Sequence, residues 1–373
     1  MTPLRLCFVG PSASVNLRRW VEWFTRRGHE VSVVTVEPAG PHLIRGFRQM
    51  NIEAIGLPRK VGRLVSAARL RLAIRRMKQD IVHVHYLRGL AWGLALRPAR
   101  PCVVTPWGSD ILEEQGAFKE WYSRSLTRRL LREADLVTTH SAYMEARVRE
   151  LEPEVRALVR IGWGVDVERF KPGLDVRGIR ERWKIGEHQR VIFSPRLAQP
   201  FYNHDRVIRA LPKVCEQVPD SVLVITEQFV DHVYVRGLQR LAAELGILER
   251  VKFVGALPYQ DMPRWLNLAD AVVMVPNSDG MPNTLLEAMA CGAVPVLSRL
   301  PQYAEVIRDG ENGCLVDEDE RSLADALVRV LSDAGFRAKV STRNRATALE
   351  IADQNREMSK MEGLYVNLVT ATG

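Results

Sequence analysis

The stretch at residues 278–292 reads SDGMPNTLLEAMACG, and it decides how the rest of the chain is interpreted. It lies between two apolar runs, 271–275 and 294–297, which have the length and composition of buried strands. Pro282 is typical of a helix start and Gly292 of a helix end. The stretch therefore predicts a strand, a turn, a helix and a second strand, which is the repeating unit of a parallel α/β sheet.

Two carboxylates accompany this predicted helix. Asp279 lies in the turn before it, and Glu287 lies about one turn inside it. A helix that begins at the carboxyl edge of a parallel sheet presents free N–H groups and the positive end of its dipole, which suits a phosphate. The alternative is that Asp279 is an ordinary turn former and Glu287 a solvated helix residue. The agreement of the glycine, the proline and the small-residue helix favours a site for a ligand with phosphate and hydroxyl groups.

The length and composition indicate the class of protein. The chain has 373 residues, enough for two domains of roughly 150–200 residues each. It has no apolar run of about 18 residues, so no membrane span is predicted. The N-terminus is interrupted too early for a signal peptide and reads as a first strand. The five cysteines are scattered without C-x-x-C spacing, which favours reduced core residues in a cytoplasmic protein.

Residues 162–173 break all periodicity, so we expect the interdomain linker there. The predicted domains are 1–172 and 173–351, and residues 352–373 read as a last helix. Apolar runs predict strands at 4–9, 31–36, 81–85, 102–105, 136–139, 191–194, 221–225, 251–253, 271–275, 294–297 and 314–316.

Three patterns argue against cofactor or metal sites. The first β-α-β unit lacks the second and third glycines of G-x-G-x-x-G, which argues against a dinucleotide. His83 and His85 alternate along one strand without a third ligand at zinc spacing, so we expect buried histidines with backbone partners. The acidic run at 317–319 precedes a predicted helix and is interpreted as a helix-start cluster.

The positive charge is concentrated in the first third of the chain. Residues 1–100 contain 18 Lys and Arg against 5 Asp and Glu, whereas residues 201–373 contain 18 against 24. Within 59–78, arginines alternate with apolar residues at helical spacing. This helix is either a solvated surface helix or an interfacial helix on anionic lipid, and both interpretations remain open. Nucleic acid is not expected as a partner, because no aromatic-rich basic strand or zinc pattern accompanies the charge.

Several motifs together carry a family likeness. The stretch 278–292 with the following 293–296 resembles the donor-site motif of retaining glycosyltransferases of the GT-B fold, the large glycosyltransferase family 4 of the "glycosyl transferases group 1" type. The other segments that look like this family are 19–20 with 27–31, 108–110, 164–170 and 303–313.

The resemblance implies a fold and a reaction. The fold would be α/β, with two Rossmann-like domains facing a central cleft and the final helix packing back on the first domain. A nucleotide sugar such as a UDP- or GDP-sugar would bind mainly to the second domain, and a lipid-linked or saccharide acceptor to the first. No cofactor or metal is expected. The anomeric configuration would be retained, with the leaving phosphate helping to deprotonate the acceptor.

The resemblance also implies roles for individual residues. Arg196 would neutralise the diphosphate, Asp279 would hold hydroxyls of the donor sugar, and Glu287 would bind the ribose. The expected catalytic residues are Asp279, Arg196 and Asp110. The expected donor-binding residues are Glu287, Gly280, Met281, Pro282, Asn283, Thr284, Gly10 and Leu257, and the acceptor-side residues are Asn16, Trp107 and Ser109.

The chain departs from the family pattern at three positions. Asp279 replaces a glutamate, Trp107 replaces a histidine, and residues 201–204 contain no lysine where one usually follows Arg196. Two alternatives to an enzyme therefore stay open. One is an inactive homologue that binds a nucleotide, and the other is a membrane-binding scaffold. For the enzyme we expect a cytoplasmic protein, peripheral at the inner face of the membrane through its basic half.

Overall fold

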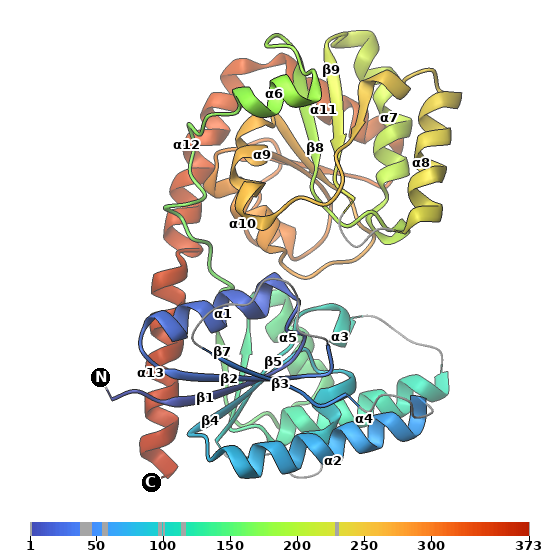
Figure 1. The fold of residues 1–373 in the computed structure, drawn as a ribbon. Coiled ribbons are helices and arrows are strands. Elements are labelled where there is room, and N and C mark those ends of the chain that lie inside the picture. The colour runs from blue at the N-terminus through green and yellow to red at the C-terminus, as the bar shows by residue number, and fades with distance from the viewer. Residues whose placement is uncertain are drawn as a thin grey trace. The chain divides into compact units, whose positions relative to one another are not determined.

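The computed structural model describes residues 2–37, 47–53, 59–95, 99, 101–112, 117–227 and 231–372. The chain divides into two units, Met1–Trp163 with Asn355–Gly373 and Gly164–Gln354 (Figure 1). Each unit is built on its own parallel sheet, with both faces of the sheet covered. The predicted α/β class, with two doubly wound domains, is confirmed.

The first unit has a seven-stranded parallel sheet with the order β3-β2-β1-β4-β5-β6-β7. The chain winds outward from β1 in one direction and from β4 in the other. The carboxyl ends of β1 and β4 therefore mark the switch point, where ligands bind in such sheets. The strands are β1 (Arg5–Val9), β2 (Glu30–Thr35), β3 (Arg48–Asn51), β4 (Ile81–His85), β5 (Cys102–Thr105), β6 (Leu136–Thr139) and β7 (Leu158–Arg160).

Helices cover both faces of this sheet. On one face α1 shares a core with residues of α13, including Trp20, Phe24 and Tyr365. On the other face α2, η1 and α4 contribute Leu70, Leu94 and other buried residues. The elements are α1 (Val15–Arg26), α2 (Arg59–Met77), η1 (Gly89–Leu94), α3 (Ser109–Leu112), α4 (Ala117–Glu133), α5 (Ala142–Leu151) and α13 (Gln354–Thr372).

The second unit has a six-stranded parallel sheet with the order β10-β9-β8-β11-β12-β13. Its switch point lies between β8 and β11. Successive residues of β8 face opposite cores, with Ile192 on one side and Phe193 on the other. The strands are β8 (Arg190–Ser194), β9 (Ser221–Ile225), β10 (Val251–Phe253), β11 (Ala271–Met274), β12 (Val294–Ser298) and β13 (Cys314–Val316).

The helices of the second unit divide between the two faces of its sheet. Residues of α7, α8 and α11 fill one core, and residues of α9 and α10 fill the other. The elements are α6 (Arg177–Trp183), η2 (Pro200–Tyr202), α7 (His204–Gln217), α8 (His232–Glu244), η3 (Leu248–Arg250), η4 (Tyr259–Asp261), α9 (Met262–Leu268), α10 (Asn283–Ala290), η5 (Tyr303–Glu305), α11 (Glu320–Ser332) and α12 (Ala334–Ile351).

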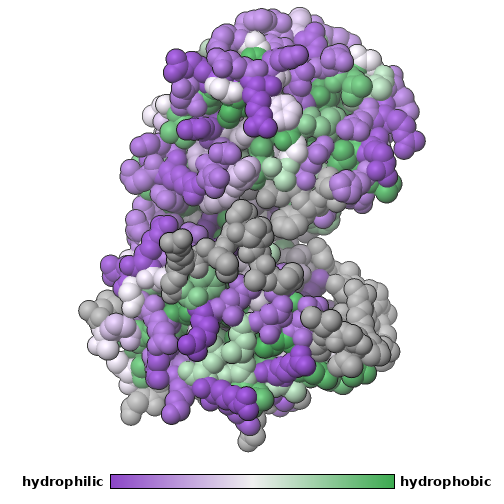
Figure 2. Space-filling view, in the orientation of Figure 1, coloured by the Kyte–Doolittle hydropathy of each residue, from purple (hydrophilic) through white to green (hydrophobic). Residues whose placement is uncertain are grey.

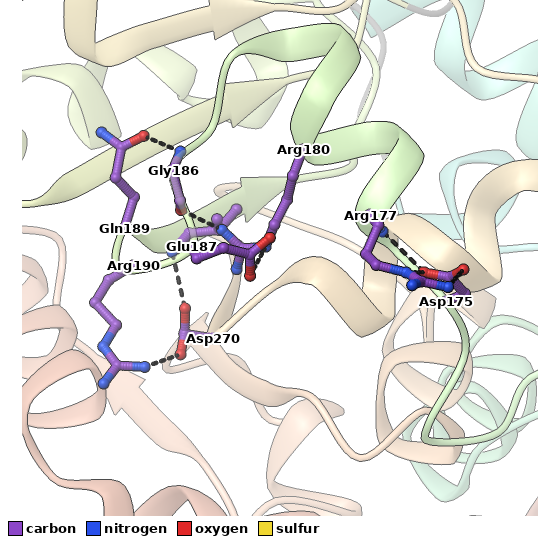
Figure 3. A network of polar contacts seen from close by, with 9 residues as sticks. Asp175, Arg177, Arg180, Gly186, Glu187, Gln189, Arg190 and Asp270 are labelled. Atoms are coloured by element: carbon purple, nitrogen blue, oxygen red, sulfur yellow. Dashed lines mark hydrogen bonds and ion pairs between the residues drawn. The ribbon is translucent and has the colours of Figure 1, made fainter.

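A polar network ties β8 to β11 at their amino ends (Figure 3). The Asp270 carboxylate accepts hydrogen bonds from Val191 N at 2.9 Å and from Arg190 Nη1 at 3.1 Å. Arg337 Nε lies 3.5 Å from the same carboxylate. The two strands of the switch point are therefore fixed to each other at the end opposite the candidate site.

Two strands and part of the linker differ from the sequence prediction. The sequence does not predict β3 and β7, because β3 is polar and β7 has only three residues, too few for a recognisable apolar run. The predicted boundary lay at residue 172, but the units divide between Trp163 and Gly164. The physical reason is that Val165 and Phe170 are fully buried in a core of the second unit.

The two histidines of β4 bond to side chains rather than to the expected backbone groups. His83 Nδ1 lies 2.5 Å from Tyr365 Oη, and His83 Nε2 lies 2.6 Å from Thr105 Oγ1. His85 Nδ1 accepts from Trp107 Nε1 at 3.3 Å. Among the residues that the structure describes, no three His, Cys, Asp or Glu side chains form a group that could hold a metal ion.

We expect the first unit to lose stability as the pH falls below about 6.5. Burial lowers the pKa of His85 and of His140 to about 3, and burial with the nearby His85 lowers the pKa of His83 well below its usual value. Between about pH 6.5 and 5 the unfolded chain binds these protons and the folded chain does not. The free energy of unfolding should therefore fall by up to about 1.4 kcal/mol per histidine per pH unit.

Urea unfolding and native-state hydrogen exchange at about pH 7 and about pH 5 measure this loss. His140→Asn should reduce the pH dependence of the first unit. The same kind of change at the exposed His188, His188→Gln, should not alter it. Equal acid sensitivity of His140→Asn and the unsubstituted protein would contradict the assignment.

Candidate functional site

The site is built at the switch point of the second sheet. Arg196 follows β8 and Asp279 follows β11, and these strands are direct neighbours. Arg196 Nη2 lies 2.8 Å from Asp279 Oδ2, and each side chain is only 14% exposed. The topology therefore brings together the two charged residues that the sequence analysis singled out.

The Asp279 carboxylate has three protein partners. Its Oδ2 also accepts a hydrogen bond from Tyr303 Oη at 2.9 Å, and its Oδ1 accepts one from Gly280 N at 2.9 Å. Burial raises the pKa of the Asp279 carboxyl above its ordinary value, and the Arg196 guanidinium with the two hydrogen bonds opposes that shift. The carboxylate is thus held in one orientation by a cation, a hydroxyl and a backbone N–H.

Arg196 lies against an aromatic ring, and its loop is braced by a buried histidine. Its guanidinium carbon lies 4.6 Å from the centre of the Tyr202 ring. Burial lowers the pKa of Arg196, but the Asp279 carboxylate together with Tyr202 and Tyr303 outweighs burial, and the net shift is upward. His204 lies 2.9 Å from both Ser194 Oγ and the Leu197 carbonyl oxygen, so it spans the loop that carries Arg196. Burial lowers the pKa of His204 to about 4, so it is neutral at pH 7.

The segment without the family lysine has a structural role of its own. Asn203 has a left-handed backbone with φ of 52°. Its Nδ2 donates to the Val275 carbonyl at 2.9 Å and to Asn277 Oδ1 at 2.6 Å. Asn203 therefore ties the start of α7 to the loop that leads into Asp279.

Helix α10 begins beside this loop and carries Glu287. Glu287 is 3% exposed, and its Oε1 accepts a hydrogen bond from Tyr259 Oη at 2.9 Å. Pro282 at the N-cap position provides no side-chain acceptor. The first residues of the helix, Asn283 and Thr284, are partly exposed. The N-terminus of α10 therefore presents its dipole without a capping side chain.

Met281 and Leu257, both predicted to bind the donor, lie in the same hydrophobic core of the second unit. Each is less than a tenth exposed. Tyr259, two residues after Leu257, packs against this core. Met281 and Leu257 thus belong to the core against which Tyr259 packs, and the Tyr259 hydroxyl extends from that core to Glu287.

In the first unit, the Asp110 carboxylate is bonded to backbone N–H groups. Oδ1 accepts from Trp107 N at 2.9 Å and Gly108 N at 2.8 Å, and Oδ2 accepts from Leu87 N at 2.7 Å. The side chain is 5% exposed, and burial raises its pKa despite these bonds. The contacts favour a structural role in joining the loops after β4 and β5, and a catalytic role for Asp110 stays a prediction.

The other predicted residues of the first unit lie at or near the carboxyl edge of its sheet. Gly10 follows β1, where a Cβ would lie 2.9 Å from the His85 carbonyl oxygen, so a larger residue does not fit. Asn16 is in the first turn of α1. Ser109 is the exposed first residue of α3. Trp107 is half-buried, with its ring 5.7 Å from that of Trp163. Gly10 lies in the first unit, whereas the other predicted donor residues lie in the second.

Sequence reasoning did not assign a role to three tyrosines at the site. Tyr303 lies in a segment that carried the family likeness, and Tyr202 lies in the segment without the lysine. The only sequence feature that pointed to Tyr259 as a site residue was its position two residues after Leu257, an expected donor-binding residue. The hydroxyls of Tyr303 and Tyr259 each donate to one of the two predicted carboxylates.

Two family models match the chain. Residues 13–164 match the "Glycosyl transferase 4-like domain" and residues 175–347 match "Glycosyl transferases group 1". The chain is 32% identical over 237 residues to the GDP-mannose-dependent alpha-(1-6)-phosphatidylinositol monomannoside mannosyltransferase of Mycolicibacterium smegmatis. That alignment covers 61% of this chain and 61% of the relative, so it spans less than two thirds of the relative's length.

Solved structures share the fold over nearly the whole chain. Sucrose-phosphate synthase from Thermosynechococcus elongatus aligns with a TM-score of 0.84 at 18% identity, covering 98% of this chain and 99% of that one. Anabaena HepE in complex with UDP and glucose aligns with a TM-score of 0.81 at 18% identity, covering 98% and 100%. The two family models agree with the sequence motifs, and the two solved structures agree with the pair of doubly wound sheets. The chain belongs to the glycosyl transferases group 1 family and has the GT-B fold.

Proposed function

We propose that this chain transfers a sugar from a nucleotide-diphosphate donor to a hydroxyl group of an acceptor, with retention of the anomeric configuration. The Arg196–Asp279 pair carries the proposal. It lies at the switch point of a parallel sheet, beside the uncapped N-terminus of α10. These features suit a ligand with a diphosphate and sugar hydroxyls.

Arg196 is the residue that would stabilise the leaving diphosphate. The guanidinium is always charged, and its planar fork matches phosphate oxygens. Since the site is largely buried, its charge acts with little screening. We also infer that transfer needs no resident metal, because Arg196 and the α10 dipole supply the positive potential that a metal would supply. The leaving phosphate would take up the proton of the acceptor hydroxyl.

Glu287 is the residue that would bind the ribose of the donor. Its Oε1 accepts from Tyr259, which orients the carboxylate, and a carboxylate is the kind of acceptor that ribose hydroxyls bind. Asp279 uses most of its acceptor capacity on protein groups, so we infer that it accepts at most one sugar hydroxyl.

The donor and acceptor classes follow from the motifs and the named relative. That relative is named for GDP-mannose and for a phosphatidylinositol monomannoside. We infer a GDP- or UDP-sugar donor and a lipid-linked or saccharide acceptor, in the synthesis of a glycolipid or surface polysaccharide. In the described part of the chain, no helix combines the length and apolar character needed to cross a bilayer.

Helix α2 has the surface expected for contact with anionic lipid. Leu64 is 70% exposed and Leu72 is 48% exposed, and Arg75 and Arg76 are exposed on the same helix. In Figure 2 strongly hydrophilic and hydrophobic residues lie side by side near the lower edge, where Figure 1 places α2. Arg71 belongs to the basic segment 59–78, but its Nε donates to the Gly93 carbonyl at 2.7 Å and so is used within the first unit. We propose a peripheral, cytoplasmic enzyme that rests on the membrane through α2.

A nucleotide screen tests the donor site. Thermal shift and calorimetry with UDP, GDP, ADP and their sugars, with and without EDTA, should show selective binding of one nucleotide that EDTA does not alter. Glu287→Ala should weaken that binding at least tenfold, because a buried charged hydrogen-bond acceptor is lost. The matched control is Glu350→Ala, at an exposed residue of α12, which should bind like the unsubstituted protein.

Turnover separates the enzyme from the two alternatives. Selective binding with no transfer to any lipid or saccharide acceptor would support the inactive homologue. If no nucleotide binds and Glu287→Ala changes nothing, the donor site assignment is wrong.

A second prediction concerns the membrane. Replacing both Arg75 and Arg76 by Gln should weaken binding to anionic vesicles about 30-fold, at about 1 kcal/mol for each charge. The same change at Arg236 and Arg240, two exposed arginines of α8 in the second unit, is the control. Vesicle sedimentation at fixed salt measures both. Equal losses for the two pairs would show that net charge, and not α2, determines binding.

A further inference from the structure

Asp279 is one methylene shorter than the glutamate of the family motif, yet it reaches Arg196. The structure shows how the shorter side chain is supported. Tyr303 Oη donates to Oδ2 of Asp279, the same oxygen that pairs with Arg196. On the other side, the Tyr202 ring lies against the Arg196 guanidinium. The four side chains thus form one series of contacts, Tyr202–Arg196–Asp279–Tyr303, which is called the clamp below.

We propose that Tyr303 and Tyr202 are positioning residues that hold Asp279 and Arg196 in the orientation needed to receive the donor diphosphate. The proposal rests on the function proposed above and deepens it. With no lysine in residues 201–204, the direction of the Arg196 guanidinium matters more for binding the phosphates. Tyr202 holds the guanidinium by direct contact, and Tyr303 holds it through Asp279.

Tyr303 is a rigid anchor. Its side chain is fully buried, and its backbone is fixed by bonds from Tyr303 N to the Leu300 carbonyl at 3.0 Å and from Ile307 N to the Tyr303 carbonyl at 2.8 Å. Gln302 Nε2, from the neighbouring residue, donates to the Asp279 carbonyl oxygen. The loop after β12 therefore supports both the backbone and the carboxylate of Asp279.

Arg196 keeps a donor that the clamp does not use. Among the described residues, its Nε is buried and has no hydrogen-bond partner. An unsatisfied N–H of a charged group costs free energy, which a phosphate oxygen at that position would recover. Nη2 pairs with Asp279, so Nε is the donor that the clamp leaves to an anion.

The simpler alternative is that Tyr303 is an ordinary core residue whose hydroxyl needed a partner. The two interpretations differ in their effect on transfer. The Tyr303 hydrogen bond stabilises the ionised carboxylate and lowers its pKa. Tyr303→Phe keeps the ring and removes that bond, so it should raise the pKa of Asp279. A purely structural loss would lower the melting temperature and leave the plateau of kcat/KM and its pH profile unchanged.

The experiment compares Tyr303→Phe with Tyr234→Phe. Tyr234 is a matched control, because its hydroxyl donates to Asp205 Oδ1 at 3.0 Å in the same unit and belongs to no part of the clamp. Carboxyl NMR of protein labelled at aspartate, with the Asp279 signal assigned from Asp279→Asn, gives the titration of Asp279 without nucleotide. The pH profile of kcat/KM gives the effect on transfer.

For Tyr303→Phe we expect the Asp279 titration and the acid limb of kcat/KM to move to higher pH. We also expect kcat/KM at its plateau to fall about tenfold or more, the usual effect of losing a hydrogen bond to a charged group. Tyr234→Phe should change none of these. An Asp279 titration and kcat/KM equal to those of the unsubstituted protein would overturn the role of Tyr303.

Tyr202 gives an independent test if Tyr303→Phe does not fold. Tyr202→Phe keeps the ring over Arg196 and should retain most activity, whereas Tyr202→Leu should lose about tenfold in kcat/KM. Activity of both variants equal to that of the unsubstituted protein would overturn the role of Tyr202. If the unsubstituted protein transfers no sugar, the proposed function fails, and the NMR titration still decides whether Tyr303 controls Asp279.

Discussion

The contact between Arg196 and Asp279 depends on one constraint, the adjacency of β8 and β11. Strands that wind outward in opposite directions leave a gap at their carboxyl ends that no connecting helix crosses. The loops after these two strands meet in that gap, and each supplies one member of the ion pair. At the other end, Asp270 ties the same strands together. A buried pair of opposite charges persists only when its geometry is fixed and its remaining polar atoms are satisfied, so the surrounding loops are organised to hold it.

The two sheets share a topology but present different chemistry at their carboxyl edges. The edge of the second sheet carries charges and tyrosine hydroxyls. The edge of the first sheet carries aromatic rings, because the Trp107 ring contacts those of His85 and Trp163. Asp110 is near them and accepts a hydrogen bond from Trp107 N. A rigid apolar edge suits the recognition of a sugar ring or a lipid-linked saccharide, whereas a charged edge suits a diphosphate.

Much of this could be predicted from sequence, because buried parallel strands are continuous apolar runs. β4, β5, β6, β9, β10 and β13 have the predicted bounds. The edge strands β3, which is polar, and β7, which has three residues, have no such signal. Arg196 and Asp279 could be singled out because each follows a predicted strand, and the strand order brings the two together. Tyr303 and Tyr259 could not, because tyrosine is equally common in cores. Their contacts join residues 24 and 28 positions apart in the sequence, and only the folded chain shows which segments meet.

The last helix has a consequence for biosynthesis. Met358, Met361 and Tyr365 fill a core of the first unit, and Glu362 pairs with His29 at 2.8 Å. These residues leave the ribosome after the whole of the second unit. Until then, the core of the first unit lacks these residues and His83 lacks its Tyr365 partner, whereas all residues of the second unit have already been made. The part of the chain that is made first therefore completes its core only after the last helix has been made.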